Sequence, residues 1–156
     1  TADPVNPNSV LVYRKKINDK KGSTEFNVVV RRADLVKGKI LERKDFIANL
    51  NTERGTQKVR EVSHLFVKRG YTGHGIASNL RDLVLFKAKQ EKSGRVTSPI
   101  WDFKGVKNRK VEEEKQRRFY KNWKEAEDEF AMTKKVTGKE RFKPRQKLFW
   151  YRKRRH

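Results

Sequence analysis

The chain has 156 residues and a formal net charge of +22, from 41 Lys and Arg against 19 Asp and Glu. It has no cysteine, which excludes disulfides and thiolate metal sites, and no apolar run of about 18 residues that would predict a membrane-spanning helix. Hydrophobic residues make up 34% of the chain, so we expect one small core, weakened by self-repulsion unless a polyanion is bound.

The N-terminal part of the sequence predicts an extended arm and a β-hairpin. Residues 1–9 hold two prolines and show no periodicity, so we expect an arm there. Residues 10–16 and 25–32 are rich in β-branched and aromatic side chains, and Asp19 and Gly22 between them favour a turn with a long basic loop. Two strands alone are marginal in water, so this hairpin needs a helix or RNA against one face.

Three helices are predicted next, at 33–50, 56–69 and 76–92. The basis is the spacing of their apolar residues, at intervals typical of one helical face. These residues are Val36, Ile40, Ile47 and Leu50 in the first, Val59, Val62, Leu65 and Phe66 in the second, and Ile76, Leu80, Leu83 and Val84 in the third. Gly70 is the expected C-cap of the second helix.

The stretch from Tyr71 to Gly75, YTGHG, is rich in glycine and precedes the third predicted helix. Glycines in such a place can bring backbone N–H groups close to a phosphate. The Lys-Ser/Thr pair of a nucleotide-binding P-loop is missing, however. We therefore interpret the stretch as a turn between two helices rather than as a nucleotide site.

A connector at 93–105 and a long amphipathic helix at 106–135 follow in the prediction. Aromatic side chains and one alanine form a narrow stripe on this helix, and we expect them to pack against protein rather than to stack on bases. The stripe consists of Phe119, Trp123, Ala126 and Phe130, with Phe119, Trp123 and Phe130 as the protein contacts.

The tail, residues 136–156, carries the densest positive charge, with aromatic side chains placed among the cations. An unpaired cation is costly to bury, so a tail of this kind needs an anionic partner, and nucleic acid supplies both phosphates and bases on which rings can stack. The predicted phosphate contacts are Arg141, Arg145, Lys147, Arg152, Lys153, Arg154 and Arg155, and the predicted stacking residues are Trp150 and Tyr151. A second tier of RNA-binding candidates consists of Arg117, Arg118, Lys68 and Arg69.

No enzymatic activity is predicted, because no convergent set of catalytic groups can be recognised. The histidines His64, His74 and His156 lack the spacing of metal ligands, and no nucleophile motif is present. We therefore expect no metal site, no cofactor and no small-molecule substrate.

The profile of basic arms, a small core and a cationic, aromatic tail resembles ribosomal proteins, especially the extended proteins of mitochondrial ribosomes. Residues 116–121, QRRFYK, are also similar to the Arg-rich step into Phe-Tyr of the small-subunit protein twenty-one family, although no proline follows here. That resemblance implies that Arg117 and Arg118 face RNA and that Phe119 and Tyr120 form the aromatic pair.

The sequence thus predicts an α+β, mostly helical fold. Its expected parts are an arm (1–9), a core of hairpin plus helices (10–92), the connector, the long helix and the tail. The predicted function is that of a structural constituent of a mitochondrial ribosome, or alternatively a cytoplasmic one, with rRNA and neighbouring ribosomal proteins as partners and no membrane insertion. Two alternatives stay open, namely a protein-interaction subunit of another complex that uses the aromatic stripe, and a free-standing nucleic-acid-binding protein.

Overall fold

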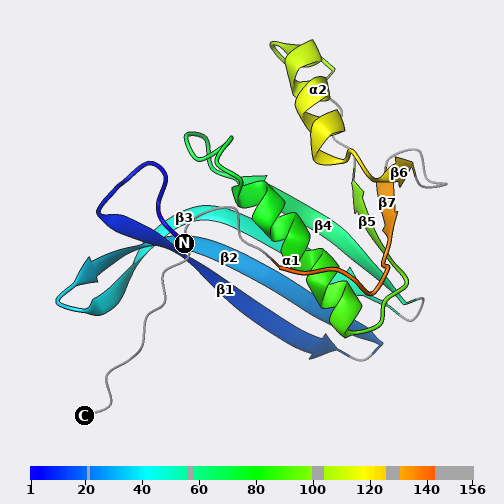
Figure 1. Ribbon diagram of the computed structural model, residues 1–156, viewed down its shortest axis with the longest axis horizontal. Coiled ribbons are helices and arrows are strands. Elements are labelled where there is room, and N and C mark those ends of the chain that lie inside the picture. Colours follow the sequence, from blue (N-terminus) through cyan, green and yellow to red (C-terminus); the bar gives the residue numbers. More distant parts are fainter. Residues whose placement is uncertain (21, 56–57, 100–103, 126–130, 143–156) are drawn as a thin grey trace.

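The computed structural model describes residues 1–20, 22–55, 58–99, 104–125 and 131–142, and Figure 1 shows their arrangement. The described residues form seven strands and two helices. The elements are β1 (Ser9–Lys20), β2 (Ser23–Val36), β3 (Lys39–Arg54), β4 (Val59–Val67), α1 (Ile76–Gln90), β5 (Arg95–Pro99), α2 (Arg109–Phe119), β6 (Lys124–Glu125) and β7 (Ala131–Lys135).

The strands form one mixed sheet in the order β1-β2-β3-β4-β5-β7-β6. Strands β1 to β4 form an antiparallel meander, and β5 is antiparallel to β7. The β4–β5 pair is parallel, so a crossover must join the two strands, and α1 supplies it.

The core lies between the sheet and α1, which crosses one face of it (Figure 1). Because side chains alternate across a strand, Phe26, Val28 and Val30 of β2 all point to this face and are buried. The helix contributes residues that recur at helical spacing and are also buried: Ile76, Leu80, Leu83, Val84 and Ala88. The prediction of a helix here, with Ile76, Leu80, Leu83 and Val84 on one side, is confirmed, and Ala88 joins them.

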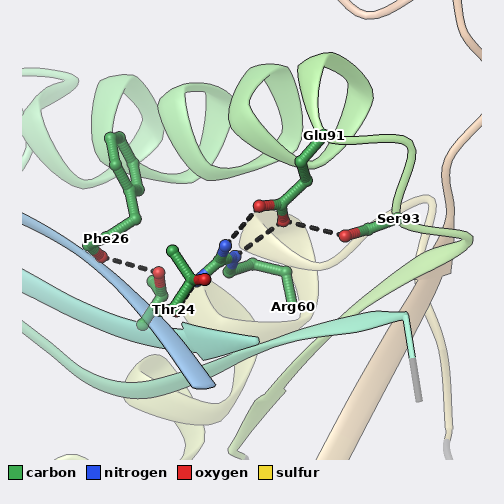
Figure 2. Close-up of polar contacts among 6 residues, drawn as sticks. Thr24, Phe26, Arg60, Glu91 and Ser93 are labelled. Carbon is green, nitrogen blue, oxygen red and sulfur yellow. Dashed lines mark hydrogen bonds and ion pairs between the residues drawn. The ribbon is translucent and has the colours of Figure 1, made fainter. Parts of the chain in front are cut away.

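A buried ion pair fastens the end of α1 to the sheet, as Figure 2 shows. The side chain of Arg60, in β4, is fully buried. Its guanidinium contacts both carboxylate oxygens of Glu91, the residue that follows α1. The same guanidinium donates to the carbonyl of Thr24 in β2, at 2.6 Å, and the Ser93 hydroxyl donates to Glu91 at 2.8 Å. One cation therefore joins β2, β4 and the helix.

The predicted fold class is wrong, because the chain is built mainly on a sheet. Where the sequence predicted helices at 33–50 and 56–69, the structure has the end of β2, strand β3 and strand β4. Where the sequence predicted one long helix at 106–135, α2 ends at Phe119 and two short strands follow. The predicted hairpin is present, but its strands pair as far as Lys20 and Ser23, so the long basic loop that was expected between them is wrong.

Neither helix of the described residues is long and apolar enough to cross a membrane.

Candidate functional site

Strands β4 and β5 run side by side only at their beginnings. In the described residues their pairing joins Val59–Glu61 to Arg95–Thr97. Beyond this point β4 continues to Val67 beside β3, whereas Ser98 and Pro99 of β5 continue beside β7. The two strands therefore separate toward their carboxyl ends (Figure 1), which is where ligands commonly bind in sheets with parallel strands.

The loop between β4 and α1 reaches the opening between the separated carboxyl ends of β4 and β5. Its backbone has a conformation that only glycine adopts readily. Gly70, Gly73 and Gly75 have φ angles of 95°, 78° and 85°. A Cβ atom added at Gly70 or Gly73 would meet no atom within 4 Å, so the loop borders open space. The loop is anchored at its start by Tyr71, which is buried and whose hydroxyl donates to the Asp3 carboxylate at 3.3 Å.

Helix α1 begins at this loop without a side-chain cap. Its N-cap is Gly75, no side chain of the described residues caps it, and its first turn contains no acidic residue. The N–H groups of the first turn therefore point toward the opening with the positive end of the helix dipole behind them. The buried Asn79 fixes the direction of this turn, because its amide donates to the Tyr13 hydroxyl of β1 at 3.1 Å. This is the geometry of a phosphate-binding helix N-terminus.

A groove of about 560 Å³ continues from the first turn of α1 toward α2. On the α1 side it is lined by Ser78, Arg81, Asp82 and Leu85. The remaining lining residues come from α2, the turn after it and β7, and include four cations, Lys115, Arg118, Lys121 and Lys134. With Arg81 the groove is lined by five cations and the carboxylate of Asp82. Lys115 and Arg118 also pair with Glu112 and Glu114, but the cations still outnumber the carboxylates, so the groove favours an anionic ligand.

Arg81 joins the two walls of this groove. Its guanidinium donates to the carbonyl of Phe119, at the end of α2, at 2.5 Å and lies 4.7 Å above the centre of the Phe119 ring. The residues of α2 itself are not buried. The attachment of α2 to the body of the protein therefore depends on this contact and on the aromatic residues that follow the helix.

Two of those aromatic residues, Tyr120 and Trp123, are buried at the end of α2. The rings of Tyr120 and Trp123 meet edge to face at 5.2 Å, and the hydroxyls of Tyr120 and Ser98 form a hydrogen bond of 2.7 Å. Ser98 lies in the part of β5 that has separated from β4. Burial raises the pKa of the Tyr120 phenol, and the hydrogen bond with Ser98 and the charge of Arg81 oppose this in part. A protonated phenol is thus held, buried, beside the part of β5 that has separated from β4.

The residues predicted from the sequence to bind RNA are scattered over the structure. Lys68 and Arg69 lie directly before Gly70, at the loop described above. Arg117 and Arg118 lie in the last turn of α2, exposed and within 3.4 Å of Glu114. Arg141 follows β7 in the described residues. No observation tests whether these residues bind a ligand, so their binding roles stay predictions. The ribosomal partner for which they were predicted is corrected below.

Several other predicted site residues lie outside the described residues, namely Phe130, Arg145, Lys147, Trp150, Tyr151, Arg152, Lys153, Arg154 and Arg155. Of the predicted protein contacts, Trp123 is buried in the core of its own chain and Phe119 packs against that core. In the described part of the chain, no group of three or more His, Asp or Glu side chains is placed to hold a metal ion.

The sequence matches no family model and no curated protein. Solved structures with some similarity to this fold are known. A protein from Klebsiella pneumoniae subsp. pneumoniae, assigned by its name to the acyl-CoA N-acyltransferases, has a TM-score of 0.50 at 10% identity, over 72% of this chain and 73% of that chain. A GNAT-family acetyltransferase from Staphylococcus aureus Mu50 has a TM-score of 0.49 at 12% identity, over 74% and 69%. An IAA acetyltransferase from Bacillus cereus has a TM-score of 0.47 at 10% identity, over 81% and 99%.

The likeness to the Klebsiella structure shows a shared fold, and it overturns the functional interpretation of the sequence. The prediction of a ribosomal constituent with rRNA and ribosomal proteins as partners is wrong, and so is the resemblance of residues 116–121 to the small-subunit protein twenty-one family. The predictions of no enzymatic activity and no small-molecule substrate are corrected as well, because a structure named as an acyl-CoA N-acyltransferase shares this fold. The mitochondrial location stays a prediction.

The sequence analysis does not single out Ser78, Arg81 or Ser98, and it names Tyr120 only as the partner of Phe119 in an aromatic pair. The available signal was YTGHG followed by the apolar helix, which did suggest phosphate binding. The missing Lys-Ser/Thr pair of a P-loop argues against a nucleotide site, and the helix predicted at 56–69 makes the stretch a turn between two helices. In the structure it joins a strand to a helix, and a glycine-rich turn of that kind is a common phosphate-binding arrangement.

Proposed function

We propose that the protein is an acyl-CoA-dependent N-acyltransferase, which transfers an acyl group from the sulfur of coenzyme A to an amine. The observation that carries this proposal is the start of α1. It is an uncapped helix N-terminus behind a glycine-rich loop, placed where β4 and β5 separate. The protein shares its fold with a structure named as an acyl-CoA N-acyltransferase, and this likeness suggests acyl-CoA as the anion that binds here.

The diphosphate of acyl-CoA fits the loop from Gly70 to Ser78. Open space above Gly70 and Gly73 lets phosphate oxygens approach the backbone, and the first-turn N–H groups of α1 would donate to them. The adjacent groove between α1 and α2 would hold the rest of the nucleotide, which carries a further phosphate. The five groove cations would neutralise that charge.

The acyl transfer itself moves two protons, one off the attacking amine and one onto the leaving sulfur. The amine nitrogen forms a bond to the thioester carbonyl carbon and releases a proton to solvent, the carbon–sulfur bond breaks, and the thiolate takes up a proton from Tyr120, which solvent then reprotonates. The Tyr120 phenol is protonated at neutral pH, burial raises its pKa further, and its hydroxyl lies beside the separated part of β5. We assign Tyr120 as the proton donor to the leaving thiolate and Ser98 as the residue that positions it.

Calorimetric titration with coenzyme A and acetyl-CoA tests the binding site. In the Ser78→Glu variant, a carboxylate in the first turn of α1 would stabilise the helix but repel phosphate. We expect its affinity for coenzyme A to fall at least tenfold, which corresponds to about 1.4 kcal/mol. The matched control is Gln90→Glu, which adds the same charge at the other end of the same helix, where Gln90 is exposed, and should leave binding unchanged.

Two results would contradict the proposal. One is the absence of any binding of coenzyme A or acetyl-CoA by the unmodified protein. The other is equal binding by the Ser78→Glu and Gln90→Glu variants, which would place the ligand away from the start of α1.

A further inference from the structure

The hairpin formed by β2 and β3 extends beyond the rest of the sheet, and its end, residues 34–42, is called the hairpin tip below (Figure 1). Regular pairing is interrupted at the base of the tip by register shifts next to Arg31. At its apex Lys37 and Gly38 have φ angles of 50° and 76°. Two positive φ angles in a two-residue connection define a tight hairpin turn, so the tip is a short, ordered ribbon rather than a loose loop.

The hairpin tip exposes large apolar side chains on both faces. Leu35 is 48% exposed, Val36 45% and Leu41 51%. Leu35 is paired with Ile40, and Val36 is paired with Lys39. Because side chains alternate along a strand, Leu35 and Ile40 share one face of the ribbon, whereas Val36 and Leu41 share the other. Contact with a flat protein surface would cover one face and leave the other in water.

The charge at the tip is positive toward its apex. The two acidic residues near its base are neutralised, because Asp34 pairs with Arg43 and Glu42 pairs with Arg14 at 2.5 Å. Lys37 and Lys39 stand at the apex, and in the described residues neither of them enters an ion pair. The apex thus combines apolar side chains on both faces with two free cations, on a chain of net charge +22.

We propose that the hairpin tip inserts into the interface of an anionic membrane. A bilayer interface surrounds both faces of a narrow ribbon, so Leu35, Val36 and Leu41 would all leave water there. Lys37 and Lys39 would lie at the level of the headgroups, where anionic lipids attract them. The remaining basic surface of the protein adds long-range attraction to the same membrane. This binding is independent of the proposed acyl transfer and would bring the protein to the membrane surface.

The chain contains no cysteine, so a single cysteine can carry an environment-sensitive fluorophore at a chosen position. We expect an NBD label at Val36→Cys to shift to the blue and brighten when phosphatidylcholine vesicles contain about one third phosphatidylserine. The matched control is Ile17→Cys, because Ile17 is an apolar strand residue that is 52% exposed but lies far from the tip in the sequence and in the sheet. Its label should not change.

A second set of variants separates insertion from charge attraction. The triple variant Leu35→Ser, Val36→Ser and Leu41→Ser keeps every charge, and its partitioning onto the anionic vesicles in flotation should fall by about tenfold or more. Ile17→Ser should float like the unmodified protein. Equal flotation of the triple variant, an equal response of the Ile17→Cys label, or the same Val36→Cys response to heparin without lipid would each overturn the proposal.

Discussion

Arg60 and Glu91 form a two-point contact in which a fully buried guanidinium meets a carboxylate whose side chain is 13% exposed. The Arg60 Nε–H donates to Glu91 Oε1 at 2.8 Å, and Nη2 contacts the other oxygen. The two residues are not equivalent, because a carboxylate without a partner can take up a proton or contact water, whereas a guanidinium stays charged. Loss of Glu91 should therefore harm the protein more than loss of Arg60.

We predict that Glu91→Met lowers the free energy of unfolding by about 3–5 kcal/mol, since it leaves a buried cation unpaired. Arg60→Met should cost less. The double variant, with neither charge, should be more stable than Glu91→Met alone, as is found when both members of a buried ion pair are replaced by apolar residues. Urea unfolding of the three variants tests this, and equal effects of the two single changes would show that Arg60 is not the buried partner.

The same ion pair makes stability depend on pH. Burial by itself raises the pKa of Glu91, but the hydrogen bonds from Arg60 and Ser93 and the charge of Arg60 outweigh it, so the pKa lies below its ordinary value of 4.5. A carboxyl whose pKa is lower in the folded state stabilises the fold above the ordinary pKa, and this contribution is lost as pH falls through the folded pKa. Unfolding experiments between neutral pH and pH values below 4.5 should show this loss in the unmodified protein and a weaker one in Glu91→Gln.

Tyr120→Phe should separate binding from chemistry. The change removes the hydroxyl but keeps the ring against Trp123, so coenzyme A should bind as before. The rate of acyl transfer should fall by about 10²- to 10⁴-fold, the usual contribution of a general acid. The assay measures the free thiol of coenzyme A that is released from acetyl-CoA in the presence of an amine acceptor. The acceptor is first found by screening. Unchanged transfer would remove Tyr120 from the reaction.

Ser98→Ala tests the positioning role separately. It leaves the buried Tyr120 hydroxyl without its partner at 2.7 Å, which should cost about 1–3 kcal/mol of stability. Transfer should slow less than in Tyr120→Phe, and its pH profile should shift because the hydrogen bond opposes the raised pKa of the phenol. Ser98→Thr, which keeps a hydroxyl, should restore the profile. A pH profile unchanged in Ser98→Ala would mean that Ser98 supports only the fold.

The strand β4 shows why much of the sheet could not be predicted from the sequence. A register shift beside Asn51 and Thr52 places Thr52 opposite Val62 but Asn51 opposite His64, so Ser63 is bulged. Val62 and Leu65 therefore face the core although they are three residues apart, a spacing that is typical of a helix. The full burial of Arg60 could not be predicted either, because a cation is rarely buried unless it is paired, and its partner Glu91 lies 31 residues away in the sequence.

The helix α1 could be predicted because its spacing is regular and its residues are strongly apolar. Ile76, Leu80, Leu83 and Val84 were assigned to one side and are buried. By contrast, the groove between α1 and α2 depends on Arg81 reaching the carbonyl of Phe119, 38 residues away in sequence. A contact between residues so far apart leaves no local pattern in the sequence. The sequence therefore did not place the basic residues of α2 beside α1, and they were predicted to bind RNA.

The most direct measurement of the central claim is an NMR titration of the labelled protein with coenzyme A. The account predicts saturable shifts of the backbone amides of Gly73, Gly75, Ile76 and Ala77, because phosphate oxygens would accept hydrogen bonds from this loop and from the first turn of α1. In Ser78→Glu the same amides should shift only at ligand concentrations about tenfold higher or more. Shifts confined to other parts of the chain, or none at all at saturating ligand, would contradict the assignment of an acyl-CoA site.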